Sequence, residues 1–499
     1  MKKGILFILC LYCILSFSGC SALSDLNGTV DSEEVHDEGV LYYLNTNYSD
    51  DWNDAKDMII SSCNYESIQI DSEKFGPLAS SIDRWNSERN GEVVALTEQA
   101  RTDYAEHPDS WDGAYTIYAN CTIERSDSKV FSYIDQCYYE QGGPHGNNVF
   151  VGYNFDSQTG EKILLSDVIS DNKSLTDALE KELLKIYDAD IFHSDDLSQY
   201  IMDHYFLASP EEQYNMQFTL GYKRITFYFS AYDLADYAEG MQEVTLVYDD
   251  YPELMDSEYC TYVPSNHAYP IFNYADNYID VNADGVMETI SVSGAEDDEW
   301  YGYNTVTVGV NGQEVTQDAY TYYLLPYYVK INENSYVYVQ LSAENDYHTF
   351  MVFDITSDMP VYVGTSNGYL RGFSNPNRFC IAEKVDILST YSGMRIFHVG
   401  DNGMPVCDSS EYAVASSTQL TSTVELEGEL LDSVTGEVIG TNKFPIGTCF
   451  RIIATDNASY IKMKTDDGRI VKFPITVDSP QTINGMDAYD CFETLWYAG

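Results

Sequence analysis

One short segment of the chain carries oxygen donors at a spacing that suits a metal ion. It reads Asp280-Val281-Asn282-Ala283-Asp284-Gly285-Val286-Met287-Glu288, with oxygen-bearing side chains at alternate positions, a glycine for the turn and a later carboxylate. Calcium is the natural ion, because this hard cation takes about six to eight oxygen ligands. The alternative is a hairpin turn rich in Asp and Asn that holds no ion.

The spacing differs from that of an EF-hand and resembles the acidic loops of extracellular β-propeller and related β-repeat proteins. That resemblance implies that a bound Ca²⁺ would take side-chain oxygens from four residues and a backbone carbonyl from a fifth: Asp280, Asn282, Asp284 and Glu288, with Val286 as the carbonyl donor. We expect such an ion to be a structural cofactor that staples the loop, without a catalytic role.

Familiar catalytic motifs are missing from the sequence. It has no GKS or GKT phosphate loop, no GxGxxG after a strand and no HExxH helix. We therefore expect that the protein is not an enzyme. A glycan-acting enzyme of the cell envelope, with an unrecognised pair of carboxylates, remains an alternative because the sequence does not give the distance between any two acids.

The first nineteen residues are typical of an export signal. Lys2 and Lys3 precede an apolar run from Ile5 to Leu15, which is too short to span a bilayer. The run ends in Phe17-Ser18-Gly19-Cys20, which resembles the bacterial lipobox although Phe17 replaces the usual Leu. The resemblance implies that Cys20 is lipidated, for example by palmitate, and that the protein is anchored to the extracytoplasmic face of the cell membrane. Ordinary secretion is the alternative.

The charge of the chain restricts its partners. The 499 residues include 26 Lys and Arg against 80 Asp and Glu, a net charge of −54. Nucleic acid and anionic lipid surfaces are excluded as main partners, and any charge-steered partner is expected to be basic. A hydrophobic content of 44% with 44 tyrosines is too rich for a disordered chain. The length allows several domains.

Eight cysteines follow Cys20, and their pairing is left open. They lie far apart, without a CxxC pair, at Cys63, Cys121, Cys137, Cys260, Cys380, Cys407, Cys449 and Cys491. Export permits disulfides, while buried free thiols are also common in large cores. A zinc or redox site built on these cysteines is not expected.

The pattern of the N-terminal half predicts an α+β domain over residues 41–250, in which helices cover an antiparallel sheet. An acidic tether is expected before it, at residues 20–40. A helix is expected after Pro77, weakened at Gly91, and another after an N-cap at Ser174. A short helix fits residues 197–206. Strands are expected at residues 114–124, 129–140, 147–155, 224–230 and 242–248, with a hairpin turn at 126–128.

Helical periodicity nearly disappears after Pro264, so the C-terminal half is expected to be all-β. Residues 265–415 predict a β-rich domain that carries the acidic loop, with either propeller-like or sandwich strands. Its strands are expected at 304–310, 327–341 and 349–353. A small SH3-like barrel is expected over residues 422–499, with strands at 449–454, 460–464 and 469–474.

Two groups of motifs resemble a known family. The first is Gly142-Gly143-Pro144-His145-Gly146, followed by Tyr153-Asn154-Phe155-Asp156, Thr159-Gly160 and Leu165-Ser166-Asp167. The second is Phe227-Tyr228-Phe229 with the segment from Tyr232 to Gly240. Together they resemble the extracytoplasmic domain shared by RsiV-type anti-sigma factors and PdaC-type peptidoglycan deacetylases, domain of unknown function 3298. Pro144 stands where that family more often has Ala.

The resemblance implies sensing or binding, because RsiV binds lysozyme through this domain and PdaC carries it beside a separate catalytic domain. An anti-sigma role is not expected, since this chain begins with an export signal, and the eight histidines lack the deacetylase His-xxx-His pair.

Candidate ligand-binding residues are His145, Tyr232 and Tyr237, each with a structural alternative in which the side chain bonds its own loop. The expected ligand is a basic protein such as lysozyme, or a cell-wall component. A structural envelope lipoprotein is the remaining alternative.

Overall fold

The computed structural model describes residues 39–499 apart from short stretches, namely residues 54, 56, 57, 71, 109, 110, 112, 144, 210–213, 256, 283, 297–301, 345, 346, 415–418, 434, 498 and 499. The expected signal peptide, Cys20 and nearly all of the tether lie outside the described residues. Among the helices that the structure describes, none combines the length and the apolar character needed to cross a membrane.

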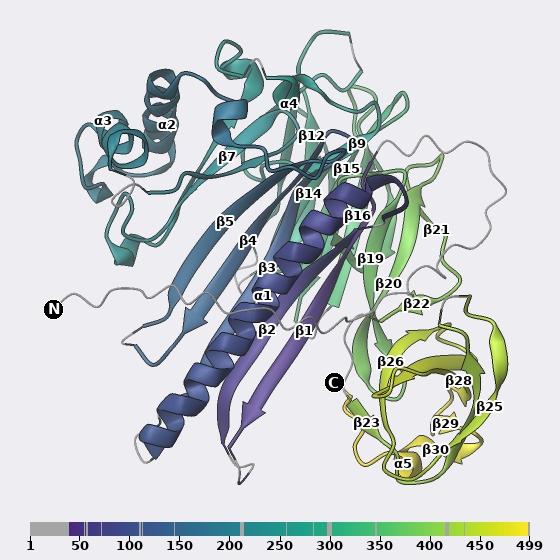
Figure 1. The fold of residues 1–499 in the computed structure, drawn as a ribbon. Coiled ribbons are helices and arrows are strands. Elements are labelled where there is room, and N and C mark those ends of the chain that lie inside the picture. Colours follow the sequence, from purple (N-terminus) through teal and green to yellow (C-terminus); the bar gives the residue numbers. More distant parts are fainter. Residues whose placement is uncertain are drawn as a thin grey trace.

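A five-stranded sheet, here called the first sheet, and helix α1 (Ser72–Glu106) form the N-terminal part (Figure 1). The strand order is β1 (Tyr42–Trp52), β2 (Ile59–Ile70), β3 (Tyr115–Ser126), β4 (Val130–Glu140) and β5 (Asn147–Asp156). Neighbouring strands are antiparallel except β2 and β3, which are parallel and connected through α1, as a parallel pair requires. The predictions of β3, β4, β5 and their hairpin are confirmed, whereas β1 and β2 were not predicted.

Helix α1 starts before its predicted position and continues through Gly91. The backbone is kinked at Phe75 (φ −117°, ψ 44°), and the regular helix follows at Pro77, which can stand in a first turn because its missing N–H is not needed there. Gly91 is exposed. Trp85 and Val93 on either side of it remain buried against the first sheet, and this packing holds the helix together.

A helical layer and a three-stranded sheet come next in the chain. They are α2 (Asn172–Ile186), α3 (Leu197–Ile201), a π-helical turn (Met202–Leu207), β6 (Gln217–Leu220), β7 (Arg224–Phe229) and β8 (Gln242–Val247). One apolar core joins these helices to the sheet, as predicted. The predicted N-cap at Ser174 is wrong. The Asp171 carboxylate caps α2 by accepting the N–H groups of Lys173 and Ser174 at 3.0 and 3.1 Å, so Ser174 lies inside the first turn.

The C-terminal half is built from strands, and its first part is a sandwich. The outer sheet has the order β10 (Asn277–Ile279), β11 (Glu288–Ser293), β12 (Tyr303–Val310) and β13 (Gln313–Thr321). The middle sheet has the order β17 (Val361–Asn367), β16 (Tyr347–Asp354), β15 (Asn334–Ala343), β14 (Tyr323–Ile331) and β9 (His267–Pro270). One apolar core lies between the two sheets.

The last sheet, here called the long sheet, crosses the expected boundary between 265–415 and 422–499. Its order is β18 (Tyr369–Arg371), β19 (Phe379–Asp386), β20 (Thr390–Val399), β22 (Tyr412–Ala413), β26 (Cys449–Thr455), β27 (Tyr460–Thr465), β28 (Ile470–Thr476), β24 (Leu426–Leu431) and β25 (Val438–Phe444). At its margins lie β21 (Pro405–Cys407), β23 (Gln419–Thr421), β29 (Thr482–Ile483) and β30 (Met486–Asp487), followed by helix α5 (Ala488–Cys491).

The predicted SH3-like barrel is wrong. The strands of residues 422–499 curl (Figure 1), but the ladder of the described residues stays open at β25. To close a barrel, β25 would have to pair with β26. The free edge of β26 is instead occupied by β22 and β23, so the same strands continue an open sheet.

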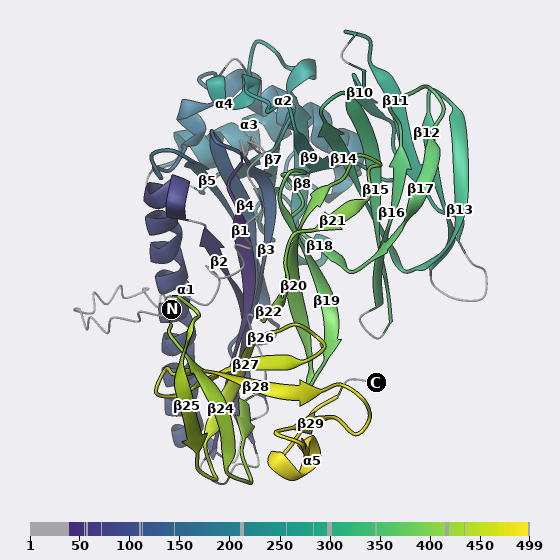
Figure 2. The same cartoon turned by 90° about the vertical axis from the view of Figure 1, so that its right-hand side faces the viewer.

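The sheets stack in layers (Figure 2). The order across the molecule is α1, the first sheet, the long sheet at β18–β20, the middle sheet and the outer sheet. Leu41 and Tyr43 touch Cys380 and Ile396 where the first and long sheets meet.

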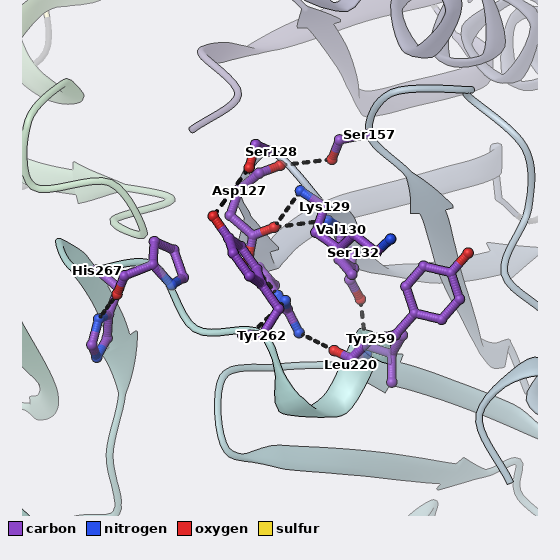
Figure 3. A network of polar contacts seen from close by, with 12 residues as sticks. Asp127, Ser128, Lys129, Val130, Ser132, Ser157, Leu220, Tyr259, Tyr262 and His267 are labelled. Atoms are coloured by element: carbon purple, nitrogen blue, oxygen red, sulfur yellow. Dashed lines mark hydrogen bonds and ion pairs between the residues drawn. The ribbon is translucent and has the colours of Figure 1, made fainter. Parts of the chain in front are cut away.

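The buried Arg125 connects the two halves of the chain. Figure 3 labels three of its partners, Asp127, Tyr259 and Tyr262. Arg125 lies at the end of β3, and its Nε donates to Asp127 at 2.6 Å. The other guanidinium nitrogens donate to the backbone carbonyls of Tyr259 and Tyr262 at 2.6 and 2.9 Å. Those carbonyls belong to helix α4 (Glu258–Thr261) and the residue after it, where the chain passes into its C-terminal half. The hairpin β3–β4 is thereby fixed to this crossover.

Candidate functional site

The two family-like motifs meet at one group of rings, the exposed His145 and Tyr232 and the partly buried Tyr237, here called the aromatic ledge. The imidazole of His145 stacks on the ring of Tyr237, with centroids 4.1 Å apart and planes at 27°. The Tyr237 hydroxyl donates to the carbonyl of Gly146 at 2.8 Å, across 91 residues of chain. Tyr232 lies 5.3 Å from Tyr237 and is 54% exposed. The structure therefore brings together all three predicted ligand-binding residues.

Local backbone geometry positions the ledge. Gly146 enters β5 against the ring of Tyr138, and a Cβ there would come within 2.2 Å of that ring, so a larger residue would displace it. Tyr232 has φ +76°, a conformation that non-glycine residues rarely adopt. Asp233 supports this corner, because its carboxylate accepts the Ser230 N–H at 2.9 Å and the Tyr205 hydroxyl at 2.8 Å. The strained corner directs the Tyr232 ring into solvent.

The contacts of the ledge are partly structural. His145 Nδ1 lies 3.0 Å from the Gly146 carbonyl, and the Tyr237 hydroxyl bonds the same oxygen, as the structural alternative requires. The ring of Tyr232 and the imidazole of His145 nevertheless stay exposed. Asp236 and Glu239 lie exposed beside Tyr237. The ledge is thus an aromatic surface with acidic neighbours, suited to a cationic group that lies over a ring.

The acidic loop at residues 280–288 uses its oxygens within its own turn. Both Asp280 oxygens accept backbone N–H groups, from Asp284 at 3.1 Å and Gly285 at 2.9 Å. Asn282 and Asp284 likewise accept N–H groups of the loop, and buried Glu288 accepts the Val281 N–H at 2.9 Å. In the part of the chain that is described, no three His, Cys, Asp or Glu side chains are grouped to hold a metal ion. Calcium at this loop stays a prediction.

A cavity of about 1260 Å³ opens where the first sheet and the long sheet diverge. Its walls come from β1–β4, from the ends of β14–β16 and from β18–β20, with Arg451 of β26 also in the lining. On β3 burial alternates: Ala119, Cys121 and Ile123 are buried, whereas Asn120, Thr122 and Glu124 are at least partly exposed, and residues 120–124 all contribute to the lining. That alternation is a sequence signal that could have indicated this wall.

Two ion pairs span the cavity walls. The β2–β3 ladder ends at the Tyr65–Ala119 pair, and beyond it the buried Glu66 carboxylate accepts the Cys121 N–H at 2.8 Å and pairs with Arg371 of β18. Glu124 of β3 pairs with Arg224 of β7 at 3.2 Å. Each buried carboxylate is thus matched by a guanidinium from another layer, which offsets the cost of its burial.

Tyrosine rings complete the cavity. Tyr323 is 72% exposed, whereas Tyr327, four residues further along the same face of β14, is buried. Tyr369 of β18 lies beside His348, with ring centroids 5.0 Å apart. Burial raises the pKa of the Tyr327 and Tyr369 hydroxyls, so both remain neutral hydrogen-bonding groups near pH 7. None of these cavity residues was predicted as a site residue.

The eight cysteines after Cys20 are all free in the described structure. Cys407 is exposed, Cys449 is partly exposed and the other six are buried. Burial raises the pKa of the Cys380 thiol to about 12, so it stays protonated and unreactive at neutral pH. The alternative of isolated buried thiols therefore describes most of them.

Comparisons with known proteins find structural similarity only. No family model matches the sequence, and no curated protein matches it. One similar solved structure is a DUF3298 family member from Bacteroides fragilis NCTC 9343, with 17% identity, a TM-score of 0.34, and coverage of 44% of this chain and 95% of that chain. Another is a DUF3298 family protein from Pseudomonas aeruginosa PAO1, with 15% identity, a TM-score of 0.30, and coverage of 45% and 98%. We take no function from either likeness.

Proposed function

We propose that this protein is a lipid-anchored, extracytoplasmic binding protein that captures a basic protein of the lysozyme type on its aromatic ledge. It performs no catalysis. The observation that carries the proposal is the convergence of His145, Tyr232 and Tyr237 on one exposed surface from two distant motifs. A cell-wall component is the second ligand class, because exposed rings also stack on sugar faces.

Charge supports the choice of a basic protein. The chain carries a net charge of −54, and Asp236 and Glu239 flank the ledge. Opposite charge accelerates encounter and orients the partner, whereas the rings supply short-range contact. A Lys or Arg of the partner over an exposed ring adds about 0.5 to 1 kcal/mol at such a site.

The proposal predicts specific binding at physiological salt. Calorimetry of the soluble full chain with lysozyme and with equally basic cytochrome c, at ~0.02 and ~0.15 M salt, separates recognition from diffuse attraction, because the Debye length falls to about 8 Å at the higher salt. We expect lysozyme alone to keep a saturable affinity there. Tyr237→Leu should weaken it about tenfold through loss of the stacked ring.

The matched control is Tyr489→Ala, which truncates a 64% exposed tyrosine of α5 and should leave lysozyme affinity unchanged. Equal binding of lysozyme and cytochrome c at both salt concentrations, or equal effects of the two substitutions, would contradict recognition at the ledge.

A further inference from the structure

The cavity between the first and long sheets differs from the rest of the molecule in its charge. Its lining carries four carboxylates and four cationic side chains, namely Asp50, Glu66, Glu124 and Glu383 against Arg224, Arg371, Lys384 and Arg451. Acids outnumber bases 80 to 26 in the whole chain. Because acidic and basic side chains are equal in number in this lining, the cavity has no strong electrostatic field of either sign. It therefore selects neither a polycation nor a polyanion.

Most of these charges are already paired inside the protein. Glu66 pairs with Arg371, Glu124 with Arg224, and Glu383 with Arg395, whose Nε lies 2.9 Å from the carboxylate. A paired carboxylate or guanidinium keeps unused lone pairs and N–H groups, which can bond hydroxyl groups without a net charge on the ligand. The pairs also fix the side chains, so a ligand finds them already oriented.

The remaining lining suits a polyhydroxylated ligand. Asn120 and Thr122 of β3 and Ser392 of β20 offer neutral donors and acceptors. The exposed Tyr323 ring provides a flat surface for the C–H face of a sugar ring, and Leu325 beside it is 37% exposed. The volume of about 1260 Å³ exceeds the ~300–1000 Å³ of a site for one small molecule, so it can hold several sugar rings.

We propose that this cavity is a second binding site and that it takes an uncharged oligosaccharide of several rings. The site is separate from the aromatic ledge, and it does not depend on the proposed capture of a basic protein. The layered fold builds it, because the first and long sheets touch at Leu41 and Tyr43 and diverge toward Thr122 and Ser392.

The experiment is calorimetric titration of the soluble full chain with three trisaccharides, namely triacetylchitotriose, cellotriose and maltotriose. The peptide Ala-Ala-Ala is titrated in the same way as a comparison ligand of another chemical class. We expect at least one trisaccharide to bind with a dissociation constant below ~1 mM and the peptide not to bind. Tyr323→Ala should weaken that binding about tenfold, as expected for loss of one aromatic contact. Thr122→Trp should weaken it further by occupying part of the cavity.

Three controls keep the result decisive. Tyr278→Ala removes a 67% exposed tyrosine of β10 and should have no effect. Tyr232→Ala tests whether the sugar binds at the ledge instead. Thermal melting checks that Thr122→Trp folds, and Ser392→Trp on the opposite wall replaces it if it does not. The proposal is overturned if no trisaccharide binds at ~10 mM, if only the peptide binds, or if Tyr232→Ala weakens sugar binding and Tyr323→Ala does not.

Discussion

His267 is a residue whose charge state is set by its place in the fold. It opens β9 with its imidazole among the rings of Tyr222, Tyr269 and Tyr328, at centroid distances of 5.4, 5.8 and 5.9 Å. Its Nδ1 bonds the Pro264 carbonyl at 2.8 Å, next to the Arg125 network (Figure 3). Burial lowers the pKa of His267 to about 4, so the folded protein holds a neutral imidazole.

This depressed pKa predicts acid sensitivity between pH 6.5 and 4. The unfolded chain binds a proton at His267 below about pH 6.5, while the folded protein does not until about pH 4, so stability falls as the pH is lowered through this window. His267→Gln should remove about 2 kcal/mol of that loss. Urea unfolding at pH 7 and pH 4.5 measures it. A wild type and variant that lose the same stability would show that His267 does not titrate in this way.

At the acidic loop the prediction concerns calcium. Asp284→Ala should lower the melting temperature in millimolar Ca²⁺ and have a much smaller effect in chelator, because an ion bound only by the folded protein stabilises it by mass action. Asp284 also accepts the Val286 N–H at 2.8 Å, so a small shift in chelator is expected from the lost turn bond. Differential scanning fluorimetry in both buffers is the measurement. Equal shifts of the melting temperature in the two buffers would show that no calcium ion stabilises this loop.

At the scale of elements, the close approach of β18 to β1 seals the narrow end of the cavity. The Tyr42 hydroxyl donates to the Gly372 carbonyl, just after β18. Gly372 has φ +61°, and a Cβ on it would lie 1.8 Å from the Tyr42 hydroxyl oxygen. Glycine is required here both by the backbone angle and by the contact between layers.

Gly372→Ala should therefore destabilise the protein by more than the backbone angle alone. We expect at least about 2 kcal/mol, from a left-handed alanine and from displacement of Tyr42. Gly447→Ala is the matched control, since Gly447 has φ +82° and nothing lies within 4 Å of its Cβ position. It should cost only about 1 kcal/mol. Chemical denaturation that gives equal losses for both variants would contradict the role assigned to this contact.

At the scale of the whole molecule, the prediction concerns the proposed lipid anchor at Cys20. Cys20→Ala should release the protein from membranes without altering its melting temperature, because the sequence predicts a polar, acidic tether at residues 20–40 between the anchor and the folded domain. Fractionation of cells that express wild type and variant, with melting curves of both, is the measurement. A variant that stays in the membrane fraction would contradict lipid anchoring at Cys20.

Residue patterns alone were enough to place many of the helices and strands. Runs rich in strand-forming residues marked β3, β4 and β5, and helical spacing marked α1 and α2. Burial alternates along β3, whereas the first six residues of β4 are all buried. Strands rich in polar residues were not predicted from such patterns. β1 includes Asn45, Thr46 and Asn47, and its pairing with β2 is visible only once both strands are in register.

How those elements meet became visible only in the folded protein. The sequence indicated His145 and Tyr237 separately, but their stacking depends on two segments separated by about 90 residues that the fold holds at 4.1 Å. The open long sheet depends on which strand occupies the edge of β26. The cavity depends on the ion pair between Glu66 and Arg371, which are 305 residues apart in the chain. Such contacts are set by the packing of layers, and local patterns in a sequence carry no information about a partner so distant in the chain.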